Sequence, residues 1–427
     1  MDKFRRCVSY IGSKAAAAAI ALAVSAPVFS GCGKVLPEVT LSVWCPQESV
    51  EAVEQMITEF TGLHSDEAVF HITVSEEEEL SCKETVLANP AAAADIYAFA
   101  DDQFRELYNA GALLEITLDA DTVIAENGGA DNGAIRSATV DGKLYAYPVT
   151  ASNGYFLYYN SAYLSEEDVK SLDRILQVAE ENGKKFAMDF TSGWYIYSFF
   201  KGAGLDVSLN EDGLTNSCDW NSANTADGKY KGRDVAEAML RIAESGGFIS
   251  CGDDDFVSGA ADGSIIAGIN GTWNAVNIEK AYGENYAAAK LPEYTVAGGS
   301  VQMCSFAGYK LMGVNSATEQ PEWSMRLAQW ITNEENQMTL FRLKGEGPSN
   351  VKAAASEEVR AAKAIAALGE QSAYGYLQNV GGSYWTPTNV FGTTIAARNP
   401  DGTDLQELLD TMVKGITSLP EDSTGTE

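Results

Sequence analysis

The chain has 427 residues, of which 45% are hydrophobic and 21% are charged, the composition of an ordinary globular protein. It carries 60 acidic and 29 basic residues, and the resulting net charge of −31 repels phosphate backbones and excludes nucleic-acid binding. Its two histidines, His64 and His71, leave little material for chemistry that needs several imidazoles. The length predicts two or three domains, each large enough for a hydrophobic core.

Basic residues at the amino terminus precede an apolar run, residues 15–29, which is short for a membrane-spanning helix. This pattern predicts an exported signal peptide over residues 1–31. The string Phe29-Ser30-Gly31-Cys32 resembles the lipobox of bacterial lipoproteins, which implies cleavage before Cys32 and a lipid on its sulfur atom, with residues 32–37 as a linker. The alternative is a plain signal peptide cut at a small residue. We therefore expect an exported protein anchored by lipid to the outer face of the cell membrane.

Strands and helices alternate after this leader. Residues 39–45 alternate β-branched and polar side chains and predict a strand, after which Ser49 is expected to cap a helix. Residues 69–74 predict a second strand and lead into a helical stretch. A third strand is predicted over residues 95–100, followed by a helix over residues 102–110. Strand, helix, strand, helix, strand is the pattern of a parallel, doubly wound sheet, so the predicted fold class is α/β.

The rest of the chain continues this mixed pattern. The remaining predicted elements, in chain order, are extended runs over residues 145–149 and 155–160, a helix that opens with the capping-box pair Ser165 and Asp168, helices over residues 321–332 and 356–368, and a disordered tail over residues 421–427.

Five cysteines remain after the leader and Cys32: Cys45, Cys82, Cys218, Cys251 and Cys304. No two of them form a C-x-x-C pair, so their spacing excludes zinc, iron–sulfur and thioredoxin-type sites. We predict one disulfide, between Cys218 and Cys251, and the alternative is that these cysteines are small buried apolar residues. No metal and no cofactor are expected.

Motifs of common enzymes are absent from the sequence. There is no G-x-S-x-G, no G-x-x-x-x-G-K-[ST] and no H-E-x-x-H, so nucleotide and hydrolase sites have no support. A calcium-like string begins at Asp219, but Asn224 stands where an EF-hand loop needs glycine. Paired carboxylates for glycoside hydrolysis stay open, because so acidic a chain always offers some pair.

Aromatic residues at the edges of predicted elements are the informative feature. They stand next to small or polar residues, whereas Trp323 and Trp330 follow helical periodicity and are expected in the core. Pyranose rings pack their C–H faces on aromatic rings, and their hydroxyls need carboxylate and amide partners. The candidate stacking residues are Trp44, Phe99, Trp194, Tyr195, Trp273, Tyr384 and Trp385, and the polar candidates in the matching loops are Gln47, Glu48, Asp101, Asp102 and Asn153.

A series of short strings spans almost the whole chain after the leader. They are Leu41-Ser42-Val43-Trp44; Ala94-Asp95-Ile96-Tyr97; Asp101-Asp102-Gln103-Phe104; Gly111-Ala112-Leu113-Leu114; residues 141–148, continuing to Tyr158-Tyr159-Asn160; Ile269-Asn270-Gly271-Thr272-Trp273-Asn274; and Gly345-Glu346-Gly347-Pro348-Ser349-Asn350. In order and spacing they resemble the extracellular solute-binding proteins of sugar ABC importers, family 1, specifically the maltose- and maltodextrin-binding branch.

The resemblance implies a two-lobe clamp of the type II periplasmic-binding-protein class. Each lobe would be a mainly parallel sheet flanked by helices. The amino-terminal lobe would comprise residues 38–149 and 304–351, and the carboxy-terminal lobe residues 152–303 and 352–420. Tyr147-Pro148-Val149 and Met303-Cys304-Ser305 would be hinge strands, so that the lobes close around the sugar by a hinge motion.

The resemblance also implies roles for residues of the predicted site. The loop after the first strand falls on Gln47 and Glu48, the aromatic and acidic string on Phe99 to Asp102, and the polar residue after the hinge on Ser152 or Asn153. The sugar-stacking aromatics match Trp194 or Tyr195, Trp273, and Tyr384 with Trp385. The chain departs from the family at Phe99, where an indole is common, and at Gln103, where a basic residue is common.

We therefore predict a non-catalytic, monomeric receptor that captures α-linked gluco-oligosaccharides outside the cell and delivers them to the permease subunits of an ABC importer. The acidic surface disfavours uronates and sulfated sugars, so the ligand is expected to be neutral. Alternatives are a binding protein for another neutral oligosaccharide, a surface polysaccharide-docking protein and a lipid-anchored glycoside hydrolase.

Overall fold

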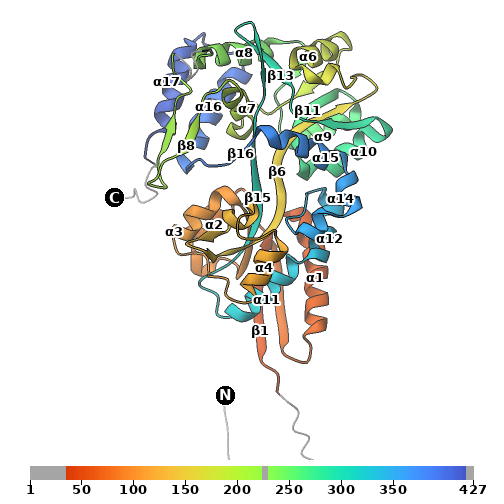
Figure 1. Ribbon diagram of the computed structural model, residues 1–427, viewed down its shortest axis with the longest axis vertical. Helices are drawn as coiled ribbons and strands as arrows, with labels where there is room; N and C mark the ends of the chain where they lie inside the picture. Colours follow the sequence, from red (N-terminus) through yellow and green to blue (C-terminus); the bar gives the residue numbers. More distant parts are fainter. Residues whose placement is uncertain (1–34, 224–228, 420–427) are drawn as a thin grey trace, which may run out of the picture. The chain divides into compact units, whose positions relative to one another are not determined.

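A computed structural model describes residues 35–223 and 229–419 (Figure 1). The predicted signal peptide, residues 32–34 of the linker with the lipid site at Cys32, and the predicted tail over residues 421–427 lie outside these residues. Asn224 of the calcium-like string also lies outside them. In the part of the chain that the structure describes, no helix is long and apolar enough to cross a membrane.

Strands and helices alternate along the chain, as predicted. The strands are β1 Glu38–Cys45, β2 Val69–Glu76, β3 Ile96–Ala100, β4 Thr139–Val140, β5 Lys143–Leu144, β6 Ala146–Asn160, β7 Lys185–Ala187, β8 Val207–Leu209, β9 Asn216–Cys218, β10 Phe248–Ile249, β11 Ile265–Gly271, β12 Tyr286–Ala289, β13 Glu293–Val296, β14 Gly299–Gln302, β15 Ser305–Val314 and β16 Gly375–Leu377. The α-helices are α1 Val50–Leu63, α2 Cys82–Ala88, α3 Phe104–Asn109, α4 Ala120–Glu126, α5 Gly133–Ser137, α6 Leu172–Glu181, α7 Gly193–Gly202, α8 Gly232–Glu244, α9 Asp253–Asp262, α10 Ala275–Tyr282, α11 Pro321–Ile331, α12 Glu334–Lys344, α13 Val351–Ala354, α14 Glu357–Ala361, α15 Lys363–Gln371, α16 Trp385–Ala396 and α17 Leu405–Ile416.

One ten-stranded sheet contains most of the longer strands. Its order is β10-β7-β11-β6-β15-β3-β1-β2, with β12 paired to β6 and β16 paired to β15. At one end β1 is parallel to both β2 and β3, and at the other end β7 is parallel to β10 and β11. Between these parallel groups, β6 and β15 pair antiparallel to each other. Each end of the sheet is thus a parallel α/β arrangement, and two long strands join them.

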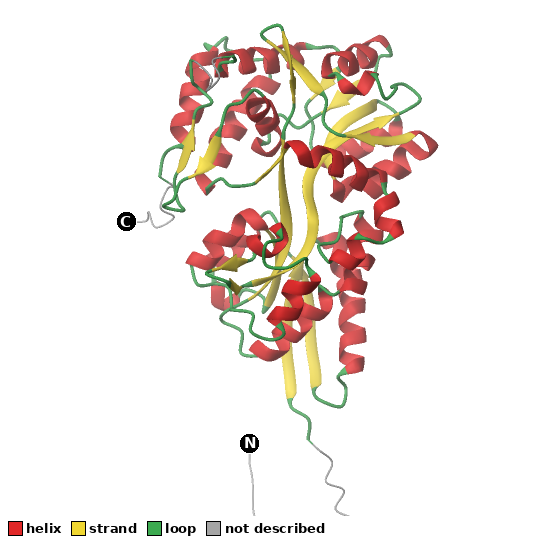
Figure 2. Cartoon of the chain, in the orientation of Figure 1, coloured by secondary structure: helices red, strands yellow, loops and turns green. Residues whose placement is uncertain are grey.

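Strands β6 and β15 are the two long strands that connect the two parts of the fold (Figure 2). Each strand runs from one hydrophobic core into another. In β6, Tyr147 and Val149 pack into the core that contains β1 and α1, whereas Tyr155 belongs to the core that contains α7 and α8. In β15, Phe306 belongs to this second core and Leu311 to the first. The fold is therefore the predicted two-lobe α/β fold with connecting strands.

The predicted hinge segments lie close to the places where the chain changes core. Along β6 the change falls between Val149 and Tyr155, and along β15 between Phe306 and Leu311. Met303, in the predicted second hinge segment, is still buried in the second core. The second crossing therefore lies a few residues later in the chain than predicted.

Two predictions of local structure are wrong: one strand is longer than predicted, and one predicted helix is interrupted. Residues 145–149 and 155–160 are not separate runs, because β6 continues through residues 150–154 with nearly every side chain buried. The predicted helix over residues 356–368 is broken at Ala362, whose extended backbone (φ −69°, ψ 120°) separates α14 from α15.

Two capping predictions hold only in part. Ser49 precedes α1 but makes no capping hydrogen bond, since a 3₁₀ turn over Gln47–Ser49 already leads into the helix. Ser165 and Asp168 do bond reciprocally, with the Ser165 amide 3.0 Å from Asp168 Oδ2 and the Asp168 amide 3.2 Å from Ser165 Oγ. They open a 3₁₀ turn, however, and α6 begins later, where the Ser171 side chain caps it.

The predicted disulfide between Cys218 and Cys251 is absent. All five described cysteines are free thiols. Cys218 packs against the core that contains α8, while Cys251 packs against a separate cluster around α9 and α10. The alternative of small apolar residues describes them better, because Cys45, Cys82 and Cys304 are buried.

Gly392 marks a close contact inside the carboxy-terminal core. A Cβ atom at this position of α16 would lie 1.9 Å from the backbone oxygen of Phe190, so Gly392→Ala forces the helix away from its neighbour. We expect a loss of about 1–3 kcal/mol in the free energy of unfolding, measured by urea denaturation.

Gly369→Ala is the matched control, because the added Cβ at this exposed position of α15 meets no atom within 4 Å. It is expected to raise the free energy of unfolding by up to about 1 kcal/mol through helix propensity. Equal stability of the two variants would contradict the packing shown here.

Candidate functional site

Strand β15 brings the candidate residues together between Phe306 and Lys310. The Phe306 ring stacks on Trp194 with centroids 5.3 Å apart, and the Tyr384 and Trp385 rings lie 6.1 and 6.4 Å from it. Trp194 is the second residue of α7 and Trp385 is the first residue of α16, so the starts of two helices meet at one strand. Trp194 and Trp385 are half-buried and retain accessible ring surface.

Trp273 forms a second aromatic position. It lies in a 3₁₀ turn over Thr272–Asn274, directly after the buried strand β11. Its Nε1 donates to Asp253 Oδ2 at 2.6 Å, and Asp253 Oδ1 accepts from Asn270 Nδ2 at 2.9 Å. The carboxylate fixes the orientation of the half-buried indole, which suits a ring that serves as a stacking surface.

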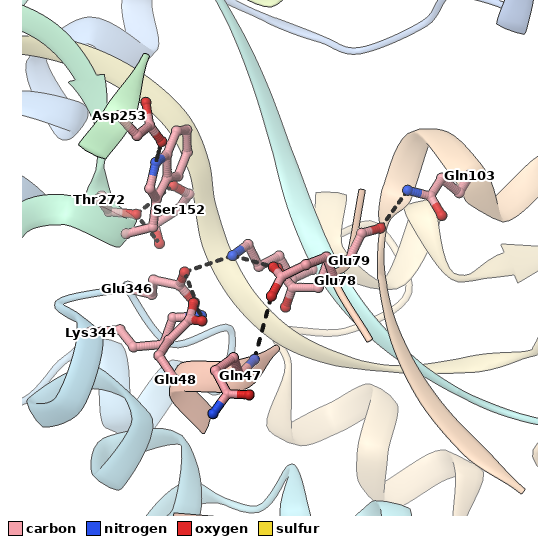
Figure 3. Close-up of polar contacts among 12 residues, drawn as sticks. Gln47, Glu48, Glu78, Glu79, Gln103, Ser152, Asp253, Thr272, Lys344 and Glu346 are labelled. Carbon is pink, nitrogen blue, oxygen red and sulfur yellow. Dashed lines mark hydrogen bonds and ion pairs between the residues drawn. The ribbon is translucent and has the colours of Figure 1, made fainter. Parts of the chain in front are cut away.

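A network of alternating charges includes Glu48, Glu79, Lys344 and Glu346 (Figure 3). Lys310 Nζ is 2.6 Å from both Glu79 Oε2 and Glu346 Oε1. Lys344 Nζ is 3.3 Å from Glu346 Oε1 and 3.0 Å from Glu48 Oε1. Of these five residues, only Glu48 was a candidate from the sequence. The ion pairs connect Glu48 to Lys310 through Lys344 and Glu346. Lys310 Nζ lies 6.0 Å from the centroid of the Trp273 ring.

Burial and mutual attraction determine the ionisation of this network. Burial alone would raise the pKa of Glu346, but the ammonium groups of Lys310 and Lys344 lower it to about 2. Burial would also raise the pKa of Glu48, but Lys344, a backbone hydrogen bond and Lys310 together hold it below its ordinary value. For both lysines, burial opposes the charge and the neighbouring glutamates raise the pKa. The charged forms of Glu48, Glu346, Lys310 and Lys344 are therefore favoured at neutral pH.

Ser152 ties the crossing segments to one another. Its hydroxyl accepts from the Gly347 amide at 2.6 Å and lies 3.2 Å from Thr272 Oγ1. Thr272 in turn donates to the Ser152 carbonyl oxygen at 3.0 Å. Asn153, the other candidate after the hinge, is buried in β6 opposite Gly308. The residues after the hinge thus link β6, the Trp273 turn and the segment that follows α12.

Asp101 lies against Gly308 of β15. A Cβ atom at residue 308 would come within 2.6 Å of Asp101 Oδ1, so glycine makes this approach possible. Asp101 Oδ1 is buried and has no hydrogen-bond partner among the described residues. Burial, and then the neighbouring Asp102, raise the pKa of Asp101 well above its ordinary value. Burial also raises the pKa of Asp102 to about 7, although Lys83 opposes the shift.

Orphaned polar atoms gather in this same region. The described residues contain four buried side-chain atoms without a partner, and three of them flank β15. They are Asp101 Oδ1 beside Gly308, Thr150 Oγ1 on the residue paired with Lys310, and Trp194 Nε1 on the indole stacked against Phe306. Buried polar atoms without partners are rare in folded proteins and mark sites where a ligand or water supplies the missing bond.

Several candidate residues do not offer a ligand surface. Phe99 is fully buried, because β3 is covered on both faces. Tyr384 is also fully buried, and its hydroxyl donates to the Gly193 carbonyl oxygen at 2.8 Å. Tyr195 is 5% exposed, and its hydroxyl reaches Asp253 at 3.4 Å. Trp44 is half-buried and packs on the amino-terminal core. Element edges therefore did not distinguish stacking residues from core residues.

Gln103, which departs from the family pattern, has a structural role. It is buried, its Nε2 donates to the Glu79 carbonyl oxygen at 2.5 Å, and its Oε1 accepts from the Lys83 amide at 2.9 Å. These bonds fix the segment that carries Glu79. Of the remaining candidates, Gln47 is exposed, and its backbone N–H donates to Glu78 Oε1 at 3.4 Å (Figure 3).

Sequence analysis missed Glu79, Asp253, Lys310 and Lys344 as site residues, and it quoted Glu346 only as part of a string. One signal was present: Lys310 is the single charged residue in β15, whose other positions are apolar, small or aromatic. Nothing in the sequence pairs it with Glu79 or Glu346. In the residues that the structure describes, no group of histidine, cysteine or acidic side chains is arranged to hold a metal ion.

Fold and site together define a two-lobe binding protein. The model of the bacterial extracellular solute-binding protein family matches residues 55–367. The chain therefore belongs to this family, as the resemblance of its strings indicated.

Known relatives agree in length and fold. The chain is 25% identical over 399 residues to the galactooligosaccharide-binding protein of Bacillus subtilis (strain 168), covering 90% of this chain and 91% of the relative. Among solved structures, it is similar to a protein crystallised with acarbose (TM-score 0.77, 27% identity, covering 89% of this chain and 99% of the other). It is also similar to the maltodextrin-binding protein of L. casei BL23 without ligand (TM-score 0.73, 25% identity, covering 89% and 99%). Both the Bacillus subtilis relative and the L. casei relative are binding proteins.

The depressed pKa of Glu346 predicts a loss of stability in acid. Because the folded-state pKa, about 2, lies below the ordinary 4.5, ionised Glu346 contributes stability above pH 4.5, and this contribution is lost as the pH falls toward 2. Glu346→Gln is expected to be less stable than wild type at pH 7 and to lose less stability between pH 4.5 and 2.5. Urea denaturation at several pH values measures both, and parallel pH profiles for the two proteins would contradict the ion pairing.

Asp101 predicts the opposite pH dependence. Its folded-state pKa lies above the ordinary 3.8, so its contribution to stability is fully present below pH 3.8 and is lost as the pH rises. Asp101→Asn should therefore melt above wild type at pH 8, and the difference in melting temperature should shrink toward pH 4. A difference that does not change with pH, measured by thermal melts, would refute the burial of this carboxylate.

Proposed function

We propose that this protein is the lipid-anchored extracellular receptor of an ABC sugar importer, and that it binds malto-oligosaccharides between its two lobes and delivers them to the permease. The observation that carries the proposal is the indole of Trp273, held by Asp253, whose ring centroid lies 6.0 Å from Lys310 Nζ of the charge network. Three orphaned polar atoms flank the strand that carries Lys310. Stacking surface and hydroxyl partners together are what an oligosaccharide needs. No step of this function breaks a bond.

The proposed clamp uses the two connecting strands as its hinge. The lobes comprise residues 38–149 with 304–351, and residues 152–303 with 352–420. Sugar favours a closed form only through contacts that both lobes make. Glu48 and Asp101 contribute from the first lobe, and Trp194, Trp273 and Trp385 contribute from the second.

α-Linked glucose units are the preferred ligand for two reasons. The strings of the chain follow the maltodextrin-binding branch, and the maltodextrin-binding relative is 25% identical to it. A galacto-oligosaccharide is the second candidate, because the Bacillus subtilis relative binds that class at the same level of identity. The two ligands differ in hydroxyl configuration and linkage, which the polar residues of the site would distinguish.

Export and anchoring follow from the leader. Cleavage before Cys32 and attachment of a diacylglyceryl group to its sulfur through a thioether bond would hold the first strand close to the outer face of the membrane, since two acyl chains anchor stably. Globomycin treatment of expressing cells, which blocks lipoprotein signal cleavage, would leave a larger unprocessed form if the lipobox functions. A mobility unchanged by the inhibitor would favour the plain signal peptide.

Titration calorimetry tests the ligand class. The protein from Pro37 onward is titrated with maltose, maltotriose, maltotetraose, galactobiose, galactotriose and cellobiose, with melting temperatures recorded in parallel. Tightest binding of the α-glucans supports the proposal, whereas tightest binding of the galactosides transfers it to the second candidate. Absence of binding in the whole panel by a folded protein refutes the proposed ligand, and conversion of a bound sugar would indicate a hydrolase instead.

Truncation of the stacking residues tests the site itself. Trp273→Ala and Trp385→Ala are each expected to weaken sugar affinity about tenfold or more, since one lost stacking contact is worth about 1 kcal/mol beyond the buried area. Trp323→Ala is the control, because Trp323 packs on Phe70 and Arg326 on the outer side of the amino-terminal core. Equal affinities for all three variants would remove these residues from the site.

A further inference from the structure

Lys310 is a buried cation that the fold does not require. It is 8% exposed, and the following residues of β15, Leu311 and Met312, are core residues. Removing an ammonium group from water is costly, and buried ion pairs can often be replaced by apolar side chains without loss of stability. Apolar residues in place of both Lys310 and its partner Glu346 would therefore be compatible with the fold, and the reason for a lysine lies outside simple packing.

The network orients the ammonium group of Lys310. Glu79 reaches it from the segment between β2 and α2, and Glu346 reaches it from the segment after α12. Glu346 is itself held by Lys344, and the Glu79 segment is fixed by Gln103. The position of Lys310 Nζ is thus set from two separate parts of the chain.

One N–H of Lys310 remains for another partner. An ammonium group has three donors; Glu346 accepts a hydrogen bond from it at 2.6 Å, and Glu79 forms an ion pair with it at 2.6 Å. Among the described residues its further neighbour is the Trp273 ring, whose centroid lies 6.0 Å from Nζ. A pyranose stacked on this indole would carry its hydroxyl groups into hydrogen-bonding reach of Lys310.

We propose that Lys310 is a specificity-determining residue of the sugar site, whose ammonium group donates a hydrogen bond to one hydroxyl of the sugar unit stacked on Trp273. Glu79 and Glu346 act as positioning residues for this donor. The inference rests on the proposed function and adds to it the residue that reads hydroxyl configuration. A charged donor held in place favours the sugar that presents a hydroxyl to it and disfavours one that lacks that hydroxyl, because the buried donor then loses its partner.

The test uses the sugar that wild type binds best, together with its monodeoxy analogues. Lys310→Met alone leaves Glu346 buried without its closest cation, so it is expected to lower the melting temperature. The double variant Lys310→Met/Glu346→Leu removes both charges and is expected to recover much of that loss, which separates stability from recognition. Arg326→Met is the control, since Arg326 makes a two-bond ion pair with Glu67 away from the candidate residues.

Calorimetry on these proteins forms a double-mutant cycle between Lys310 and each sugar hydroxyl. We expect wild type to lose roughly 10- to 100-fold in affinity for one deoxy analogue, as for a lost charge-assisted bond, and the double variant to lose less than about threefold for the same analogue. The control should reproduce the wild-type pattern.

The other outcomes are equally informative. If wild type and the double variant show the same ratio of affinities for every analogue, Lys310 reads no hydroxyl and the inference is overturned while the proposed function stands. Full recovery of affinity together with the melting temperature in the double variant also overturns it, because the lysine is then only structural. If folded wild type binds none of the sugars, the proposed function and the inference both fail.

Discussion

The two long strands β6 and β15 are the constraint on which the rest of the molecule depends. Each strand contributes side chains to both cores, so neither lobe can form its sheet without them. Any movement between the lobes must be absorbed where the strands change core, at residues 150–154 and 307–310. These segments are rich in small residues, and the pairing of β15 with β6 is irregular between Gly308 and Leu311. The same stretch holds the candidate site, so a ligand bound there contacts the hinge directly.

Polar groups are concentrated at this crossing at some cost in stability. Buried Lys310, Lys344 and Glu346 need one another, and Asp101 keeps a buried oxygen without a partner. A sequence selected for stability alone would place apolar residues at such positions. Burial raises the pKa of Asp101, whereas the pKa of Glu346 is lowered. The two differ because lysines surround only Glu346. Environment, and not residue type, therefore assigns neutral and charged roles to acidic side chains in one site.

Local patterns carried most of the fold, and distant pairings could not be predicted. Val53, Met56, Ile57 and Phe60 recur at helical spacing and are buried in α1, and β1, β2 and β3 lie where strands were predicted. The continuity of β6 was missed because a strand buried on both faces has no alternation to read. Phe99 and Trp273 both follow apolar strand residues in the sequence, yet Phe99 is a core residue and Trp273 is half-buried. Only the packing of neighbouring elements in the fold determines which of these two rings is covered. The charge network joins residues 48, 79, 310 and 346, which no local rule connects.

The position of the cation in the site is where this chain differs from the pattern of its family. In the family that the chain resembles, a basic residue is common at position 103. Here Gln103 is buried, and its side-chain amide forms hydrogen bonds with the Glu79 carbonyl oxygen and the Lys83 backbone amide. In the proposed site the positive charge comes instead from Lys310, which lies in β15 where that strand passes from one core to the other. A donor attached to the hinge strand moves whenever the lobes move, whereas a donor at the start of α3 moves with one lobe only. Recognition of the sugar and closure around it would then depend on the same side chain, so exchanging the cation for an apolar residue changes which sugar drives closure without changing the fold.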